Sequence, residues 1–389
     1  MLLRGKKVKM KKVMCNPRNN WQEKCDSLGF YFHSVDGRYW VEEYGIEFTQ
    51  KEMDELYKVT YELNQMCLDM AADIVQKGDY HYYGLPVDVS QEIETSWKNK
   101  DFNLYSRFDL SYDGLTSPKL LEYNADTPTC LIESANVQKE WQLELFPQYT
   151  QFNNVEKNLI KRWGEFKNLY PNINTLHFTS HVFSQEDWCN AEFMRECAVK
   201  AGINTHYLSI QDIGWDYVKQ KFCDDKNNNI DFLFKIHPWE MLIVDEFYPH
   251  IKRDNITIIE PMWKMLLSSK AILPLLWKKY PNHPNLLPAF FKEEEMLKVS
   301  HNFVKKPLLS RDGANVLVLE NDKIVDSEGG FYGGEGFVYQ QRKDVVCFDN
   351  RYSMIGSWLF GDEPSGLSIR EDYSIITKST SWFVPHYVK

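Results

Sequence analysis

The spacing of hydrophobic and polar residues predicts three kinds of structure along the chain. Between residues 50 and 77, hydrophobic side chains recur at spacings of three and four, which predicts one long amphipathic helix ended by Gly78. From 172 to 260, short hydrophobic runs alternate with helix-like segments, which indicates a parallel sheet in an α/β lobe. Residues 263–280 predict another helix. Residues 301–389 are rich in β signals and predict an antiparallel β lobe.

Two predicted strands, "LYSRFDLSY" and "KLLEYN", flank a turn at Asp113–Gly114. Residues two apart on a strand project to one face, so Arg107 and Asp109 share a face, as do Glu122 and Asn124. In a hairpin, two carboxylates and an amide oxygen would converge as hard ligands suited to Mg²⁺, beside an arginine suited to a developing negative charge. A solvated hairpin face with cross-strand charge pairs would give the same pattern, so both interpretations stay open.

Two lysines lie where an anionic partner is expected. Lys306 follows a hydrophobic run and precedes Pro307, so either it or Lys305 faces inward, and a buried lysine is uncommon without an anion. Lys270 lies in the first turn of a predicted helix, where a cation opposes the helix dipole unless an anion is also bound. Lysines that extend along the surface would give the same pattern.

Glycine-rich connections lie between the strands of the predicted β lobe. The polar turn at Gly313 has backbone N–H groups to spare, and "SEGGFYGGEG" at 327–336 includes Gly333 and Gly334. Such a loop lets N–H groups approach phosphates and can act as a mobile flap, although any flexible hairpin loop would look alike. Arg370 ends a later strand beside two acids, where a structural salt bridge is the default interpretation.

Composition excludes several classes of protein. The chain has 389 residues, of which 43% are hydrophobic, enough for a large folded core. Its 45 basic and 55 acidic side chains give a net charge of −10, which argues against nucleic acid or an anionic membrane as the main partner. No run of about 18 apolar residues predicts a membrane span.

The cysteines and the first residues indicate a cytoplasmic protein. None of the eight cysteines forms a CxxC pair or a zinc-site spacing, which is typical of buried thiols in a reducing compartment. The basic segment 1–19 has no hydrophobic run behind it, so it is not a secretory signal. We expect that segment to be disordered.

The order of these motifs resembles one family. "RFDL", "LLEYNADTPT", "EPMWKMLLSSKAILPLLWKKYPNHPNLLPAFF", "VKKPLLSRDGAN", "YQQ" and "LSIRED" together resemble the synthetase domain of glutathionylspermidine synthetases, over about residues 20–389. The chain looks closest to the stand-alone members, which lack the amidase domain of the bifunctional enzymes. The resemblance implies an α/β (α+β) permuted ATP-grasp fold, with an α/β substrate lobe at about 172–260. It also implies a β-rich nucleotide-binding lid at about 264–345.

The resemblance also implies roles for single residues. Asp109, Glu122 and Asn124 match ligands of two Mg²⁺ ions, with Glu122 bridging. Arg107 matches the arginine that stabilises the reacting acyl centre, and Arg370 matches a second arginine near the transferred phosphate. Residues expected to hold ATP are Lys270 and Lys306 at the phosphates, Gln340 and Gln341 at the adenine, and Gly313, Gly333 and Gly334 in the flanking turn and flap.

The segments that match substrate contacts follow the family less closely. Thr127 and Thr129 stand where the family has small hydroxyl residues that contact the acid substrate. Glu240, in "HPWEM", is expected to contact substrate, but the next residue, Met241, stands where the family has a threonine. The family's polyamine-side acid near the C-terminus also lacks a match. We therefore expect substrates that need not be glutathione and spermidine.

The resemblance and the residues agree on one chemistry. Amide formation from a carboxylate is uphill in water, so ATP first converts the carboxylate to an acyl phosphate, which an amine then attacks. The expected cofactors are ATP and two Mg²⁺ ions, and the expected partners are a small-molecule or peptide carboxylate and an amine or polyamine. A phosphotransferase and a non-catalytic ATP-binding protein on the same fold remain alternatives. The arginines Arg107 and Arg370 favour acyl transfer.

Overall fold

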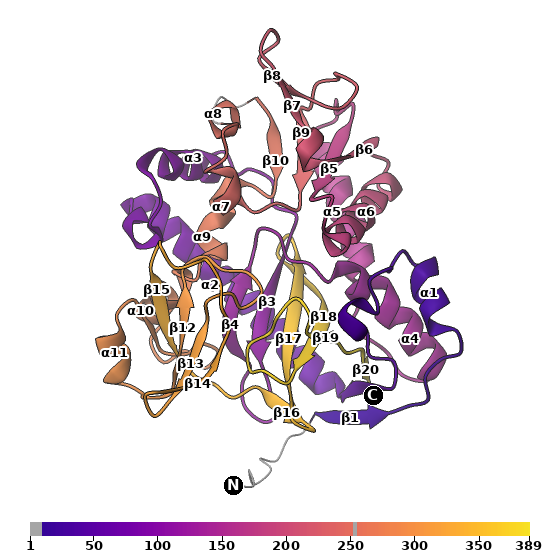
Figure 1. Cartoon of the computed structure of the whole chain (residues 1–389), viewed down its shortest axis with the longest axis vertical. Coiled ribbons are helices and arrows are strands. Elements are labelled where there is room, and N and C mark those ends of the chain that lie inside the picture. The colour runs from indigo at the N-terminus through magenta and orange to yellow at the C-terminus, as the bar shows by residue number, and fades with distance from the viewer. Residues whose placement is uncertain (1–9, 252–254) are drawn as a thin grey trace.

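A central antiparallel sheet joins residues 105–124 to the C-terminal part of the chain (Figure 1). The computed structural model describes residues 10–251 and 255–389. Neighbouring strands follow the order β19-β18-β17-β3-β4, and β16 pairs with the start of β17. The predicted β lobe at 301–389 is therefore wrong in its second half, because the last long strands belong to the sheet of the hairpin. The strands are β3 (Tyr105–Ser111), β4 (Lys119–Asn124), β16 (Val346–Phe348), β17 (Arg351–Phe360), β18 (Glu363–Asp372) and β19 (Trp382–Phe383).

The predicted hairpin is confirmed, and its register brings the candidate site residues opposite one another. Arg107 lies opposite Asn124, and Asp109 opposite Glu122, with a bulge directly after Asp109. On the other face the rings of Phe108 and Tyr123 stack with centroids 3.9 Å apart. Because side chains alternate along a strand, this buried aromatic face directs the charged residues to the opposite side of the sheet.

A second antiparallel sheet lies within the segment where the nucleotide-binding lid is predicted, and it is called the lid sheet below. Its strand order is β11-β15-β12-β13-β14, so the glycine-rich loop connects the edge strand β14 to β15. Helix α11 (Glu293–Leu297) precedes β12 along the chain. The strands are β11 (Ala289–Phe290), β12 (Phe303–Pro307), β13 (Leu317–Glu320), β14 (Lys323–Ser327) and β15 (Phe337–Gln341).

The helix predicted at 263–280 is broken in the structure. A 3₁₀ turn at Met262–Lys264 and helix α9 (Met265–Ser268) come first, and α10 (Ile272–Lys279) follows. Ser269 adopts an extended backbone, and the N–H of Lys270 donates to the carbonyl of Leu308 at 2.9 Å. This bond to the end of the lid strand replaces an intrahelical bond, so Lys270 lies in the break and not in a first helical turn.

The predicted α/β lobe contains a four-stranded parallel sheet in the order β10-β9-β5-β6. Trp163 of α5 packs against Phe178 and Phe234 on one face. The small hairpin β7–β8 and helix α8 cover the other face. The elements are α5 (Val155–Leu169), β5 (Leu176–Ser180), α6 (Gln185–Lys200), β6 (Thr205–Ser209), β7 (Gly214–Asp216), β8 (Lys221–Cys223), β9 (Phe232–Lys235), α7 (Trp239–Leu242), α8 (Tyr248–Ile251) and β10 (Thr257–Ile259).

The N-terminal part of the described chain is ordered. Strand β1 (Lys11–Met14) pairs with β2 (Tyr44–Phe48), which pairs in parallel with β20 (His386–Val388). The expected disorder of residues 1–19 is therefore wrong from residue 10 onward, and residues 1–9 lie outside the described residues. The lysines of β1 mark an edge strand, where positive charge discourages pairing with other chains.

The long predicted helix is confirmed as α2 (Gln50–Lys77), closed by Gly78 at a φ of +70°. Thr49 and Glu52 form a capping box at its start. Among the described residues, no helix combines the length and hydrophobicity needed to cross a membrane. The remaining helices are α1 (Trp21–Ser27), α3 (Val87–Lys98) and α4 (Gln138–Leu145).

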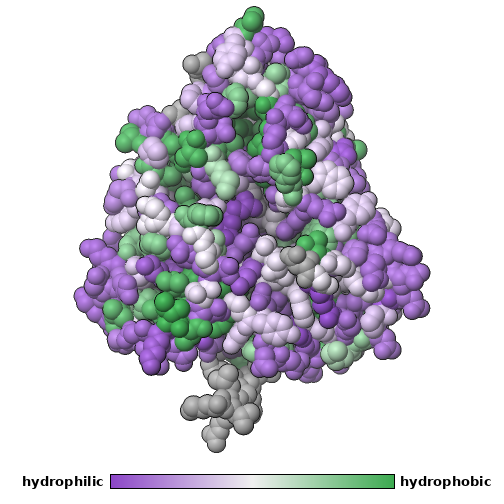
Figure 2. All heavy atoms as spheres, viewed as in Figure 1, coloured by the Kyte–Doolittle hydropathy of each residue, from purple (hydrophilic) through white to green (hydrophobic). Residues whose placement is uncertain are grey.

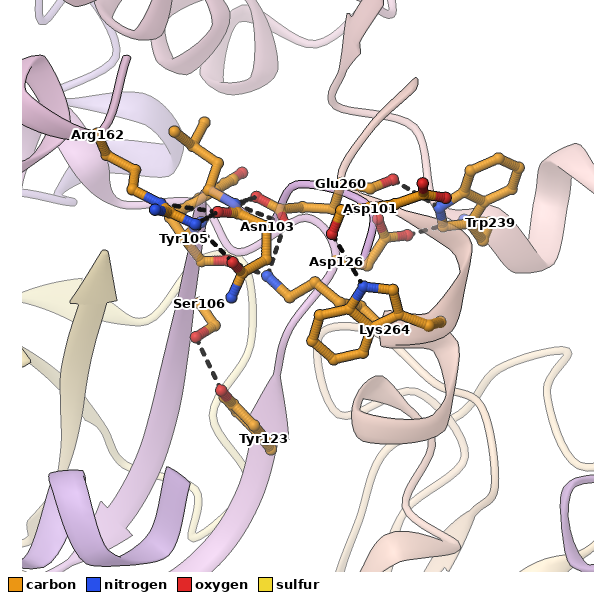
Figure 3. A network of polar contacts seen from close by, with 12 residues as sticks. Asp101, Asn103, Tyr105, Ser106, Tyr123, Asp126, Arg162, Trp239, Glu260 and Lys264 are labelled. Atoms are coloured by element: carbon orange, nitrogen blue, oxygen red, sulfur yellow. Dashed lines mark hydrogen bonds and ion pairs between the residues drawn. The ribbon is translucent and has the colours of Figure 1, made fainter. Parts of the chain in front are cut away.

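A buried network of charges joins the parallel sheet to the central sheet (Figure 3). Glu260 follows β10 and accepts hydrogen bonds from the backbone N–H groups of Leu104 and Tyr105, at the start of β3. Lys264 donates to the Glu260 carboxylate at 2.7 Å and to the carbonyl of Tyr105 at 2.6 Å. Both charged side chains are buried, so bulk water cannot take the place of the partner if either one is removed.

We predict that Lys264→Ala destabilises the protein by about 3–5 kcal/mol, because it leaves the Glu260 carboxylate buried without its counter-charge. The matched control is Lys77→Ala, which removes the exposed pair with Asp73 and should cost less than about 0.5 kcal/mol. Urea unfolding followed by tryptophan fluorescence measures both. Equal losses in the two variants would contradict a structural role for the buried pair.

Candidate active site

The central sheet, the lid sheet and the α/β lobe enclose a cavity of about 220 Å³. All the predicted site residues line it except Gly333 and Gly334. From the hairpin and the following turn come Arg107, Asp109, Glu122, Asn124, Thr127 and Thr129, and from the other elements Glu240, Lys270, Lys306, Gly313, Gln340, Gln341 and Arg370. Residues that are up to 263 positions apart in sequence (370 − 107) therefore meet around one space.

The carboxylates of the hairpin lie close together. The Asn124 side chain donates to Asp109 Oδ2 at 3.0 Å and to Glu122 Oε1 at 3.1 Å, so a single amide nitrogen contacts both acids. Arg107 Nε donates to Asp109 Oδ1 at 2.8 Å. Burial, opposed by Arg107 and reinforced by Glu122, raises the pKa of Asp109. Burial also acts to raise the pKa of Glu122, but the ammonium groups of Lys270 and Lys306 lower it overall.

The two predicted lysines face this cluster from the lid side. Lys270 Nζ lies 3.4 Å from Glu122 Oε2 and donates to the carbonyl of Ser310 at 3.1 Å. Lys306 Nζ donates to the carbonyl of Leu121 at 2.9 Å and to Gln340 Oε1 at 2.8 Å. Both lysines are buried, and burial lowers the pKa of Lys306 to about 8. A desolvated ammonium beside a single carboxylate favours binding of a further anion.

The two arginines are held differently. Arg107 Nη1 donates to the carbonyl of Thr129 at 2.9 Å, which fixes the guanidinium against residues 125–129. This turn is called the substrate turn below, because substrate contact is predicted there. Arg370 is buried, and its guanidinium donates to the carbonyl of Ser381 at 2.8 Å, to two further backbone carbonyls, and to Cys130 Sγ at 2.9 Å. The salt bridge expected for Arg370 is therefore wrong, because carbonyls and a sulfur hold it, and its charge stays uncompensated by a carboxylate in direct contact.

Arg311 and Lys235, to which sequence reasoning gave no role, hold the substrate turn in place. Arg311 Nη1 donates to Thr127 Oγ1 at 3.1 Å. Asp126 pairs with Lys235 at 2.7 Å and accepts a hydrogen bond from the backbone N–H of Trp239 at 2.8 Å. Lys235 is 1% exposed and lies 109 residues from Asp126 in the sequence. The one sequence signal for a buried charge here is that Lys235 ends a hydrophobic strand.

The glycine-rich loop lies beside the cavity without lining it. The N–H of Gly333 donates to Glu335 Oε2 at 3.1 Å, and the N–H of Leu309 donates to Glu335 Oε1 at 2.9 Å. Gly333 has a φ of +117°, where a side chain would meet the ring of Phe337. The structure therefore explains the glycine at 333 by backbone conformation, and contact of Gly333 or Gly334 with a nucleotide stays a prediction.

Comparison with known proteins gives the family. Residues 12–389 match the sequence profile described as glutathionylspermidine synthase preATP-grasp. The chain belongs to this family. The predicted family is thus confirmed, over nearly the whole of the chain.

The relatives carry related names. A Haemophilus influenzae protein provisionally named an acid–amine ligase is 42% identical, with 97% of this chain and 99% of that protein covered. Trypanothione synthetase from Crithidia fasciculata is 26% identical, with 90% of this chain and 59% of that protein covered. The bifunctional glutathionylspermidine synthetase/amidase of Escherichia coli is also 26% identical, over 87% of this chain and 58% of that protein. The chain thus spans under two thirds of the two longer relatives.

One solved structure supports the fold alone. A glutathione synthetase-like effector from Globodera pallida, in its apo form, superposes with a TM-score of 0.54 at 10% identity, covering 95% of this chain and 96% of that one. The mixed α/β architecture is therefore shared by a glutathione synthetase-like protein with almost no sequence similarity.

Proposed function

We propose that this protein is an ATP-dependent ligase that joins a carboxylate to an amine, with the elements in a permuted ATP-grasp arrangement. One observation carries the proposal. The acids of the hairpin, two buried lysines and two arginines, from four separate parts of the chain, face one cavity. The names of the family's members agree with this chemistry.

The lid side of the cavity suits a nucleotide. Lys270 and Lys306 present ammonium groups at the base of the lid, where phosphate oxygens would take the place of the carbonyl and amide acceptors that hold them. Gln340 donates from its side chain to the carbonyl of Leu120 at 3.0 Å, which orients its oxygen toward Lys306. Gln341 and Gly313 line the same side. We propose that the loop with Gly333 and Gly334 covers the bound nucleotide.

The hairpin acids fit a divalent cation. Asp109 and Glu122 both accept a hydrogen bond from the side-chain amide of Asn124, and carboxylate oxygens grouped in this way are ligands that Mg²⁺ prefers. We propose that these residues hold Mg²⁺, with two ions as the family resemblance implies. The cation would neutralise charge on the triphosphate and so favour phosphoryl transfer.

The arginines then act on the acyl centre. The γ-phosphate of ATP passes to the carboxylate, which gives an acyl phosphate and ADP. The amine attacks the carbonyl carbon, phosphate leaves, and the amine nitrogen loses its proton as the amide forms. Arg107 and Arg370 hold fixed positive charge where these oxygens become more negative, and neither needs to reorient because protein atoms already fix both.

The substrate side is formed by the turn after the hairpin and by helix α7. Thr127 and Thr129 offer hydroxyl groups there, and Glu240 offers a carboxylate that an ammonium would pair with. Met241 is 42% exposed and cannot donate a hydrogen bond as a threonine would. We therefore propose that the substrates are a carboxylate and an amine or polyamine that need not be glutathione and spermidine.

A reducing, cytoplasmic location is part of the proposal. All eight cysteines are free thiols. Five of them are buried, Cys15 and Cys223 are partly buried, and Cys347 is exposed. Free cysteines in a chain of this size are typical of proteins kept in a reducing compartment.

We predict that Asp109→Asn and Lys306→Ala each lower ATP turnover by about 100-fold or more, because each removes a charge that contacts the reacting phosphates or their cation. Lys305→Ala is the matched control. Its ammonium lies over the Phe337 ring at 4.3 Å, outside the cavity, and its loss should change turnover by less than about twofold. ADP release measures all three, and full activity in either site variant would reject the assignment.

A second prediction concerns a glycine beneath the arginine. Gly356 of β17 lies opposite Asp109, and a Cβ there would come within 2.7 Å of Arg107 Cδ and 2.2 Å of Ser368 Oγ. Gly356→Ala should displace Arg107 and lower turnover about 100-fold, since a shift near 1 Å has that effect on a reacting group. Gly164→Ala, where a Cβ meets no atom within 4 Å, should leave turnover unchanged.

The decisive experiment is incubation with Mg-ATP and pools of peptide or small carboxylates and polyamines, read by ADP release and by mass. A condensed product with loss of water establishes the ligase and names its substrates. A phosphorylated product without an amide would instead show a phosphotransferase. Nucleotide binding without turnover across broad pools would contradict the proposal.

A further inference from the structure

The α/β lobe contains a second cavity, of about 300 Å³, whose lining residues are all different from those of the first. It lies on the face of the parallel sheet that β7, β8 and α8 cover. Figure 2 shows hydrophobic residues gathered in the upper part of the molecule, where Figure 1 places this lobe. The volume is at the lower end of the ~300–1,000 Å³ typical of small-molecule sites. Its apolar wall includes Ile213, Phe222, Leu233, Leu242, Phe247 and Ile258.

The topology of the sheet places this cavity where ligands bind in open α/β folds. The chain passes from β5 to β6 on one side and later returns to β9 and β10 on the other, so the order reverses between β5 and β9. Ligands bind in the crevice at the carboxyl ends of the strands at such a reversal. His181 directly follows β5 and His237 follows β9, with ring centroids 5.2 Å apart, and both line the cavity.

The polar groups of the cavity gather at this same end. The Gln211 side chain lies 2.8 Å from His181 Nδ1. Lys235 also lines the cavity, and its ammonium pairs with Asp126 at 2.7 Å. Within the described part of the chain, the ring of His237 has no hydrogen-bond partner. The single acid in the lining, Asp245, already accepts a backbone N–H at 2.8 Å.

We propose that this cavity is a second ligand site, which binds a small molecule with an apolar body and a carboxylate-like head that meets His237, His181 and Lys235. The apolar body occupies the aliphatic and aromatic wall, and the head accepts hydrogen bonds from the imidazole and ammonium groups. The positive surroundings that lower the pKa of His237, after burial, agree with an anionic head. This site goes beyond the proposed ligase reaction and does not depend on it.

The test uses sodium octanoate as the probe, with binding to the full chain measured by isothermal titration calorimetry at saturating ADP. We expect one saturable site. Hexanoate should bind about tenfold more weakly, because each buried CH₂ contributes about three- to fourfold. Octylammonium should bind at least about tenfold more weakly than octanoate, because its head cannot accept a hydrogen bond. Equal binding of the amine would overturn the assignment of the head group.

Variants separate this cavity from the first. Leu242→Trp should fill the cavity and weaken octanoate binding at least about tenfold, and Ile213→Trp is the second such variant if the first unfolds. Val218→Trp, at a residue that is 93% exposed and outside the lining, is the matched control and should bind as the parent does. No saturable binding, or binding that both filling variants leave unchanged, would overturn the proposal.

A last variant tests the proposed function and the second ligand site independently of each other. Lys306→Ala removes ATP turnover under the proposed function but should keep octanoate affinity within about twofold, because Lys306 lies in the other cavity. If Lys306→Ala keeps full turnover while octanoate binding depends on Leu242, the ligase assignment fails and the second site stands. Loss of octanoate binding in Lys306→Ala would place the probe in the first cavity and overturn the second site.

Discussion

The register between β3 and β4 is the constraint on which the site depends. With Asp109 opposite Glu122, two acids and the amide of Asn124 share one face, and the stacked rings of Phe108 and Tyr123 share the other. A slip by one residue would turn every side chain of one strand to the opposite face. The aromatic pair therefore does more than fill the core, because its burial fixes which face carries the charges.

Charge compensation within the cavity depends on that register. Glu122 lies 3.4 Å from Lys270, while Lys306 is bonded to neutral groups, a carbonyl and the side chain of Gln340. Each ammonium group can therefore still attract an anion. The free-energy cost of burying the two lysines has already been met when the protein folds. Under the proposed function, phosphate oxygens would replace the neutral acceptors that now hold these ammonium groups, and no further desolvation of the lysines would be needed.

The sequence predicted correctly those elements whose hydrophobic and polar residues repeat with a regular local period. The period of two on the hairpin and the spacing along α2 both predicted structure that is present. Prediction from the sequence failed where contacts between residues far apart in the chain determine the local structure. The bond from Lys270 to Leu308 breaks a helix, and the pairing of β17 with β3 moves the last long strands out of the lid's sheet. The clearance under Arg107 that makes position 356 a glycine likewise exists only once β17 is in place.

The same geometry explains how specificity can vary while the chemistry is kept. Asp126 belongs to the substrate turn, and it holds both Lys235 and the first backbone N–H of α7, at Trp239. The backbone of α7 is therefore fixed by buried bonds that do not involve the exposed side chain of Met241. Met241 does not line the cavity, so a substitution at 241 changes the exposed surface of α7 without moving Glu240, which does line it. Under the proposed function, the exposed side chain of α7 can therefore vary while the hairpin acids and the two lysines keep their contacts.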